Sequence, residues 1–434
     1  MASPLVHLHR ARAPIRPTRS RSTMSRIRLV VVAVLWGTGT LLLAGDVPTD
    51  RVIEFLTPRV ERDPDDFISW NKLAERYVDL LRETGNIEFL PRARAAATQS
   101  LKAFPPDQNP GGLAARGRVE MAEHRFAAAG ETAGQLRELM PGKSLPCQML
   151  GDALLELGQY PEAERAWHEM VEIEGSSVNT EPRLARLDLI HGRIDKARER
   201  FTTTLEIART LTPAQPSVVA WTFVQLGALA FQCGDWELAE KHYQAALEAI
   251  PDGWAALDHL AELRGAQGRI EEARALYEKL ITRVSRPELQ QALGDLLAFG
   301  GREEEARAWH DKAEKTYLAA GVAGEVLYFH HLAGFYADSR SEPAKAVTWA
   351  RKDLELRQSI HAHDALAWAL YKKGETAEAV AASDRALATD VRDSHLLYHA
   401  GMIRMSAGDI ARGKALLKEA AAVNPRFNTF HAHR

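Results

Sequence analysis

Residues 227–243 read GALAFQCGDWELAEKHY, and closely similar stretches occur at 151–167 (GDALLELGQYPEAERAW) and 401–417 (GMIRMSAGDIARGKALL). In each stretch a glycine precedes a turn, a small residue follows five positions later, and an aromatic or apolar residue follows four positions after that. Apolar residues on both sides of the turn recur at helical spacing. The pattern therefore predicts two amphipathic helices joined by a tight turn.

The small residue after the turn recurs along most of the chain. It falls at Ala93, Ala129, Ala163, Ala197, Ala239, Ala273, Ala306, Ala346, Ala379 and Gly413. The steps between successive markers are 36, 34, 34, 42, 34, 33, 40, 33 and 34 residues. A fixed period near 34 residues indicates a repeat architecture. The sequence thus predicts an all-α solenoid of about ten helix–turn–helix repeats over residues 67–427.

Glycines occupy the positions that such a repeat requires. Gly158, Gly234 and Gly374 terminate first helices, where the backbone needs a left-handed conformation. Gly151 and Gly227 lie inside first helices, at a cost of about 1 kcal/mol relative to alanine. We expect that cost to be tolerable only if the partner helix passes very close. Because one unit cannot bury its apolar face alone, neighbouring units must stack.

The unit at 220–253 carries nearly the whole pattern of a known repeat family. The matching positions are Leu226, Gly227, Ala230, Gly234, Trp236, Ala239, Tyr243, Ala246 and Pro251. This unit resembles the tetratricopeptide repeat (TPR), and the resemblance extends over the ten units. The whole array is similar to exported multi-repeat TPR proteins of high-GC bacteria. The resemblance implies a right-handed superhelix whose first helices line a concave groove, and a scaffold that binds a protein or peptide there.

The N-terminal segment differs in composition from the repeats. The first 45 residues hold seven arginines and no acidic residue, and residues 29–44 form an uncharged apolar stretch. Such a stretch is long for a signal-peptide core and short for a membrane-spanning helix. We therefore divide the chain into a basic region at 1–28, a signal-peptide core or membrane anchor at 29–45, a linker at 46–66, the repeats, and a short tail at 428–434.

Positive charge before an apolar segment stays on the cytoplasmic side of a bacterial membrane. The repeats are therefore expected to be exported, or tethered to the membrane if the segment is not cleaved. Met24 begins a compact signal-like start, so residues 1–23 are an over-extended start in this interpretation. An organellar transit peptide is the alternative, because the first 28 residues are rich in arginine and free of acid.

Charge and cysteine content limit the function further. The formal net charge of the chain is −3, but without the seven N-terminal arginines 48 basic residues face 58 acidic ones. A nucleic-acid-binding domain would normally be basic, so nucleic acid is not expected as a partner. Cys147 and Cys233 lie in apolar helical contexts, and we expect both to be buried thiols without a disulfide.

The stripe of the first helices opposite their packing stripe predicts which residues face the groove. In the middle of the chain this stripe holds Asp152, Asp258, Glu262, Glu288 and Asp295. The Lys, Arg and Asn set with which members of the family clamp an acidic peptide C-terminus is absent from it. A basic segment is therefore the better electrostatic match for a partner. An ordinary solvated acidic surface is the alternative.

Toward the C-terminus the same stripe becomes aromatic and rich in histidine. It holds His330, His361, Asp364, Trp368, Tyr371, His395, Tyr398 and Met402. Aromatic residues are enriched at binding hot spots. These eight residues, together with Asp258, Glu262 and Asp295, are the predicted partner-binding residues. The alternative is that Trp368 and Tyr371 pack against the adjacent repeat.

The sequence contains no catalytic motif. A phosphate-binding glycine loop after a strand, a Gly-x-Ser-x-Gly elbow and an HExxH pair are all absent. We therefore expect no enzymatic activity, no catalytic residue and no cofactor. His395 and His399 have the i,i+4 spacing of metal sites, and His361, with His363 or Asp364, could supply further ligands. An extracytoplasmic metal- or small-ligand-binding protein is thus the alternative function.

Overall fold

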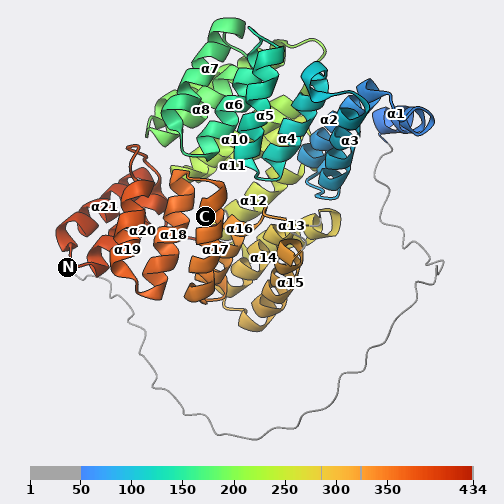
Figure 1. Ribbon diagram of the computed structural model, residues 1–434. Coiled ribbons are helices and arrows are strands. Elements are labelled where there is room, and N and C mark those ends of the chain that lie inside the picture. Colours follow the sequence, from blue (N-terminus) through green and yellow to red (C-terminus); the bar gives the residue numbers. More distant parts are fainter. Residues whose placement is uncertain (1–49, 285, 323–324, 433–434) are drawn as a thin grey trace, which may run out of the picture. The chain divides into compact units, whose positions relative to one another are not determined.

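The computed structural model describes residues 50–284, 286–322 and 325–432. Within these ranges the chain forms twenty-one α-helices and no β-strand. Helix α1 precedes the repeats, and α2 to α21 form ten consecutive pairs (Figure 1). The predicted all-α solenoid of about ten helix–turn–helix repeats is confirmed.

The even-numbered helices are the first helices of the pairs. They are α2 (Phe67–Thr84), α4 (Pro110–Ala122), α6 (Ser144–Glu156), α8 (Thr180–Ile190), α10 (Pro216–Gln232), α12 (Trp254–Ala266), α14 (Pro287–Phe299), α16 (Phe329–Gly334), α18 (Ile360–Lys373) and α20 (Ser394–Ser406). Helix α16 continues into one turn of π-helix at Phe335–Ser339. The second helices are α3 (Phe89–Ala103), α5 (Phe126–Leu139), α7 (Tyr160–Glu174), α9 (Ile194–Thr210), α11 (Trp236–Ala249), α13 (Ile270–Arg283), α15 (Glu303–Val322), α17 (Pro343–Leu356), α19 (Thr376–Ala386) and α21 (Ile410–Val423).

Each pair packs around the small residue that marks it in the sequence. All nine marker alanines are at most 2% exposed, and Gly413 is buried as well. The glycines inside first helices receive large side chains from the second helices. A Cβ atom added to Gly227 would lie 2.3 Å from the Tyr243 ring, and one added to Gly151 would lie 2.3 Å from Trp167 Nε1. The close helix approach predicted from these glycines is therefore confirmed.

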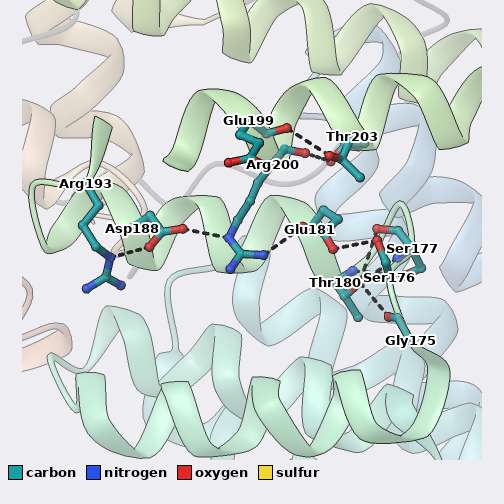
Figure 2. Close-up of polar contacts among 11 residues, drawn as sticks. Gly175, Ser176, Ser177, Thr180, Glu181, Asp188, Arg193, Glu199, Arg200 and Thr203 are labelled. Carbon is teal, nitrogen blue, oxygen red and sulfur yellow. Dashed lines mark hydrogen bonds and ion pairs between the residues drawn. The ribbon is translucent and has the colours of Figure 1, made fainter. Parts of the chain in front are cut away.

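The fourth pair, α8 and α9, adds buried ion pairs to its apolar contacts. Arg200 of α9 binds Asp188 at 2.7 Å and Glu181 at 2.9 Å, both on α8 (Figure 2). Arg193 binds the other carboxylate oxygen of Asp188. Because Asp188 is only 4% exposed, its charge depends on these two guanidinium groups for compensation.

Helix α1 occupies part of the segment that the sequence analysis assigned to a linker at 46–66. It runs from Arg51 to Arg62, and the Asp50 side chain caps it by accepting from two backbone N–H groups. Leu56 and Val60, four residues apart, are buried in the apolar cluster of the first repeat. This segment is therefore an amphipathic helix of the folded array. Its single short apolar stripe, between charged residues, is too brief to stand out in the sequence.

Repeats that lie about five units apart along the chain contact one another. The turn at Gly158, in the third repeat, meets the backbone of Gln358 just before α18. The turn at Gly192, in the fourth repeat, meets the backbone of Asp390 before α20. A Cβ atom at either glycine would come within 2.5 Å of the facing carbonyl oxygen. These glycines therefore serve both a left-handed turn, with φ of 72° and 67°, and a close backbone approach.

Arg357, directly after α17, is the centre of this contact between distant repeats. Its guanidinium binds Asp353 at 3.1 Å and donates to His124 Nδ1 at 2.8 Å. It also lies 3.6 Å from the Glu156 carboxylate and 5.0 Å from the centre of the Phe126 ring. We call these five residues the Arg357 contact zone. They join the second and third repeats to the eighth. Burial and the nearby Arg357 cation lower the pKa of His124 to about 3.

The chain folds back onto the array after α21. Asn424 Nδ2 donates to the carbonyl oxygen of Phe231 at 3.4 Å, and Arg426 Nη1 donates to that of Gly234 at 3.2 Å. Phe430 is 2% exposed within the apolar cluster of the sixth and seventh repeats. The segment expected to be a short tail at 428–434 is therefore packed against the repeats over residues 428–432, which are the residues of it that the structure describes. We call residues 424–432 the docked tail.

No helix in the described ranges is both long enough and apolar enough to cross a membrane. The basic region predicted at 1–28 and the signal-peptide core or anchor predicted at 29–45 lie outside the described residues.

Candidate partner-binding surface

The first helices form a continuous row. Successive first helices contact each other, as α2 does with α4, α10 with α12, and α18 with α20. We call the surface of this row that points away from the second helices the first-helix face. Stacked helix pairs use such a face as an extended binding surface. All the predicted groove residues lie on first helices.

Ion pairs connect the first helices of the first four repeats. We call the three pairs Glu75–Arg118, Asp152–Arg183 and Glu156–Arg186 the ion-pair ladder. Arg183 makes two bonds to Asp152, at 2.8 and 2.7 Å. The predicted groove residue Asp152 is therefore already neutralised by a neighbouring repeat, and this part of the face carries mixed charge.

The arginines of the ladder were missed from the sequence, where only the acidic side of the stripe was recognised. A signal was nevertheless present. Arg183 follows Asp152 by 31 residues and Arg186 follows Glu156 by 30 residues, close to one repeat period. Oppositely charged residues one period apart fall on adjacent first helices, where they can pair. The electrostatic argument for a basic partner is correspondingly weaker on these repeats.

The acidic residues of the sixth and seventh repeats also have partners inside the chain. Asp295 lies 2.9 Å from His310 Nε2. Asp258 is 7% exposed and Glu262 is 2% exposed. A Glu262 oxygen accepts the backbone N–H of Ala432, in the docked tail, at 2.7 Å. The predicted acidic stripe is thus engaged by the protein itself.

Trp368 is the centre of the aromatic cluster on α18 and α20. Its ring stacks on His399 with 4.0 Å between ring centres, and on Tyr371 at 5.0 Å. Its Nε1 donates to the Asp338 carboxylate at 3.1 Å. His399 in turn lies 2.8 Å from Asp364. Trp368 therefore packs against the adjacent repeat, which was the alternative interpretation of the sequence. Its indole nevertheless remains half-buried, so part of the ring is still available for contact with a partner.

The remaining predicted residues of the C-terminal stripe have three different environments. His330 Nδ1 lies 3.2 Å from Asp353 and borders the Arg357 contact zone. His361 is exposed and Met402 is half-buried on the first-helix face. His395 meets the edge of His431 at 4.3 Å.

Three predicted binding residues touch the docked tail. Tyr398 lies 5.3 Å from the Phe427 ring, His395 contacts His431, and Glu262 binds the N–H of Ala432. The structure thus places a segment of the same chain against part of the predicted partner-binding site.

The described histidines do not converge on a metal site. In the described part of the chain, no group of three or more His, Cys, Asp or Glu side chains is arranged to hold a metal ion. His399 is paired with Asp364, His363 is 7% exposed, and His395 faces the tail. This arrangement gives no support to the alternative function of metal binding.

Comparison with known proteins identifies the repeats. Two family models, both described as tetratricopeptide repeat, match residues 218–286 and 259–320. Residues 218–320 of this chain therefore carry tetratricopeptide repeats. The matched TPR residues span α10 to α15, and the same helix-pair architecture continues on both sides of them. Arrays of TPR units present extended surfaces for binding other proteins.

Individual TPR proteins match this chain over part of its length. Tetratricopeptide repeat protein 21A of Mus musculus is 27% identical over 173 residues, which are 39% of this chain and 13% of that protein. A TPR protein from Parabacteroides merdae has 17% identity and a TM-score of 0.39, over 60% of this chain and 99% of its own. YrrB, described as a TPR protein with an unusual peptide-binding site, has 20% identity and a TM-score of 0.27, over 46% and 95%.

Proposed function

We propose that this TPR protein is a scaffold without catalytic activity that binds a segment of another protein on its first-helix face. The observation that carries the proposal is the half-buried aromatic cluster of Trp368, Tyr371 and Tyr398 on that face. Aromatic side chains that keep part of their rings accessible, next to a continuous helical surface, are typical anchors for a bound segment.

The chemistry of the partner follows from which groups remain accessible. A basic segment would compete with Arg183 for Asp152, with His310 for Asp295 and with the docked tail for Glu262. The proposal therefore depends on apolar and aromatic contacts more than on charge. Nucleic acid is not proposed as a partner, since the ladder pairs each of its arginines with a carboxylate.

Photo-crosslinking tests the proposal. A photoreactive amino acid at His361 or Met402, on the first-helix face, should capture the same partner protein in cells. The matched control positions are Ile173 on α7 and Leu318 on α15, two exposed apolar side chains of second helices. Capture of one partner from first-helix positions alone supports the proposal. Equal capture from both sets of positions, or none from either, would contradict it.

We further propose that the repeats act outside the cytoplasm, either exported or tethered to a bacterial membrane. The support is the run of seven arginines before the apolar stretch at 29–44. Cell fractionation, together with sequencing of the mature N-terminus, tests this. We expect a membrane-bound or exported protein. A full-length protein found only in the cytoplasm would contradict the proposal, and a protein imported into an organelle would favour the alternative.

A further inference from the structure

The docked tail lies on the first-helix face of the fifth to seventh repeats. We propose that it fills a peptide-binding site there, and that a partner segment with a phenylalanine anchor binds by displacing it. This inference rests on the proposed function, because it names a binding position and the chemistry of the ligand.

The ring of Phe430 lies in a pocket whose floor is Gly265 of α12. A Cβ atom at Gly265 would come within 2.4 Å of the ring, so only glycine leaves room for it. Gly265 is not in the left-handed region, and glycine weakens a helix interior. Its role here is therefore to accommodate a ring. Phe299, whose own ring centre is 5.8 Å away, is 53% exposed, so one wall of the pocket reaches solvent.

Glu262 provides the acceptor for a peptide backbone beside this pocket. Its carboxylate is 2% exposed and accepts the N–H of Ala432 at 2.7 Å. The same carboxylate lies 3.6 Å from His259 Nδ1 on its own helix and 3.9 Å from His431 Nδ1 in the tail, and the N–H adds a hydrogen bond to these contacts. The donor here is a main-chain group that any extended segment possesses. A side-chain pocket combined with main-chain recognition is the usual division of roles in peptide binding.

The tail lies against the helix pairs as a bound peptide would, and it is not part of any of them. All ten helix pairs are complete without it, and residues 425–432 contain no regular helix or strand. Chain ends stay ordered only where they are tied down. Besides Phe430 and the Ala432 N–H, Asn424 donates to the Phe231 oxygen at 3.4 Å, and the His431 ring centre lies 5.0 Å from that of Phe231. Arg426 is a further tie. It donates to the Gly234 oxygen at 3.2 Å and lies 4.4 Å from the Trp236 ring centre.

The tail therefore displays the chemistry of a ligand for this site. It has an arginine four residues before the phenylalanine, and two residues after the phenylalanine a main-chain N–H that donates to Glu262. The tail also covers Tyr398 and His395 through Phe427 and His431. A partner segment of the form Arg-x-x-x-Phe would replace the tail and would uncover these two residues of the aromatic stripe.

The test measures binding of a fluorescently labelled peptide with the sequence of residues 424–434 to the full chain, by anisotropy. The Phe430→Glu variant, which releases the tail, should bind the peptide roughly tenfold or more tightly than the wild type, because the competing segment is removed. Phe55→Glu is the matched control. Phe55 is a 65% exposed phenylalanine on α1, and its replacement should leave peptide binding at the wild-type level.

A second variant locates the site. Gly265→Leu in the Phe430→Glu background places a side chain in the pocket and should abolish the gain in affinity. Gly134→Leu on α5 is its control, since a Cβ atom there meets nothing within 4 Å, and it should keep the gain. A peptide in which the phenylalanine matching Phe430 is replaced by glutamate should not bind.

Three results would overturn the inference. One is peptide binding to Phe430→Glu that is no tighter than to the wild type, and another is binding that Gly265→Leu does not reduce. The third is loss of helical circular dichroism in Phe430→Glu, since the tail would then be a permanent part of the core. If the peptide fails to bind while crosslinking from His361 still captures a partner, this inference fails alone. If the peptide binds at Gly265 while no partner is captured, the proposed function fails alone.

Discussion

The ion-pair ladder and the Arg357 contact zone satisfy charged side chains in two different ways. In the ladder, each arginine pairs with a carboxylate of the preceding repeat, and both side chains of Asp152–Arg183 keep close to a fifth of their surface exposed. In the contact zone, Arg357 compensates Asp353, a carboxylate of its own repeat that is 1% exposed, and the same guanidinium bonds His124 across 233 residues of sequence. Partly exposed pairs contribute little to stability, whereas a buried charge that loses its partner is costly. Contacts between distant repeats should therefore matter more to the stability of this array than contacts along the row.

The largest effect is expected at the centre of the contact zone. Arg357→Ala leaves the buried Asp353 carboxylate with His330 as its remaining close partner and removes the tie to the second and third repeats. We expect a loss of about 3 kcal/mol in the free energy of unfolding, measured by urea denaturation. Arg351→Ala on α17, the helix that ends directly before Arg357, is the control. Its pair with Glu378 is exposed, and it should cost less than about 0.5 kcal/mol. Equal losses for the two variants would remove the distinction between the two regions.

The contact zone should also respond to acid. The pKa of His124 is lowered to about 3, below its ordinary value of 6.5. Between these values the unfolded chain binds the proton and the folded chain does not, so stability falls as the pH is lowered from 6.5 toward 3. His124→Asn, which tolerates the left-handed backbone at this turn (φ 58°), should reduce the loss of stability between pH 7 and pH 4.5 by about 2 kcal/mol.

The control for this prediction is His168→Asn, a change at an exposed histidine of α7. Urea denaturation of the three proteins at pH 7 and at pH 4.5 measures the difference. The pH prediction fails if wild type and His124→Asn lose the same free energy over this range.

The smallest effect is expected in the ladder. Arg183→Met removes the two bonds to Asp152 but leaves that carboxylate partly exposed to water, so the expected cost is about 1 kcal/mol. Arg137→Met is the control, because the pair with Glu169 joins second helices and is more exposed. It should cost close to nothing. A cost for Arg183→Met as large as that for Arg357→Ala would mean that the ladder, too, is essential to the fold.

The same comparison explains how far the sequence predicted the fold. The markers from Ala93 to Gly413 and the mid-helix glycine Gly227 correctly predicted ten pairs and the close helix approach, because both depend on residues within one repeat. The contact of Gly158 with Gln358 could not be predicted. It depends on the angle between successive repeats, summed over five of them, and no local pattern encodes that sum. Helix α1 was missed because only Leu56 and Val60 mark its buried side.

The residues of the candidate site could likewise be predicted from the sequence, but their contacts could not. The sequence placed Trp368, Glu262 and Tyr398 on one stripe of the first helices, and the structure puts all three on first helices. The partners of these residues were not predictable, because they come from other repeats or from the tail. Asp338 binds Trp368 from the π-helical turn after α16 in the eighth repeat, and Ala432 reaches Glu262 from 170 residues away. Helical periodicity thus predicts which face a side chain occupies, and only the folded array shows what covers it.

Hydrogen–deuterium exchange of the wild-type chain tests most directly whether the docked tail is a displaceable occupant of the first-helix face. Amides of residues 426–432 should exchange more slowly than those of the free tail peptide, yet roughly tenfold or more faster than those of α12 beneath them. Excess unlabelled tail peptide should accelerate their exchange. Exchange as fast as in the free peptide would show that the tail does not dock, and exchange as slow as in α12 would show that it is not displaced.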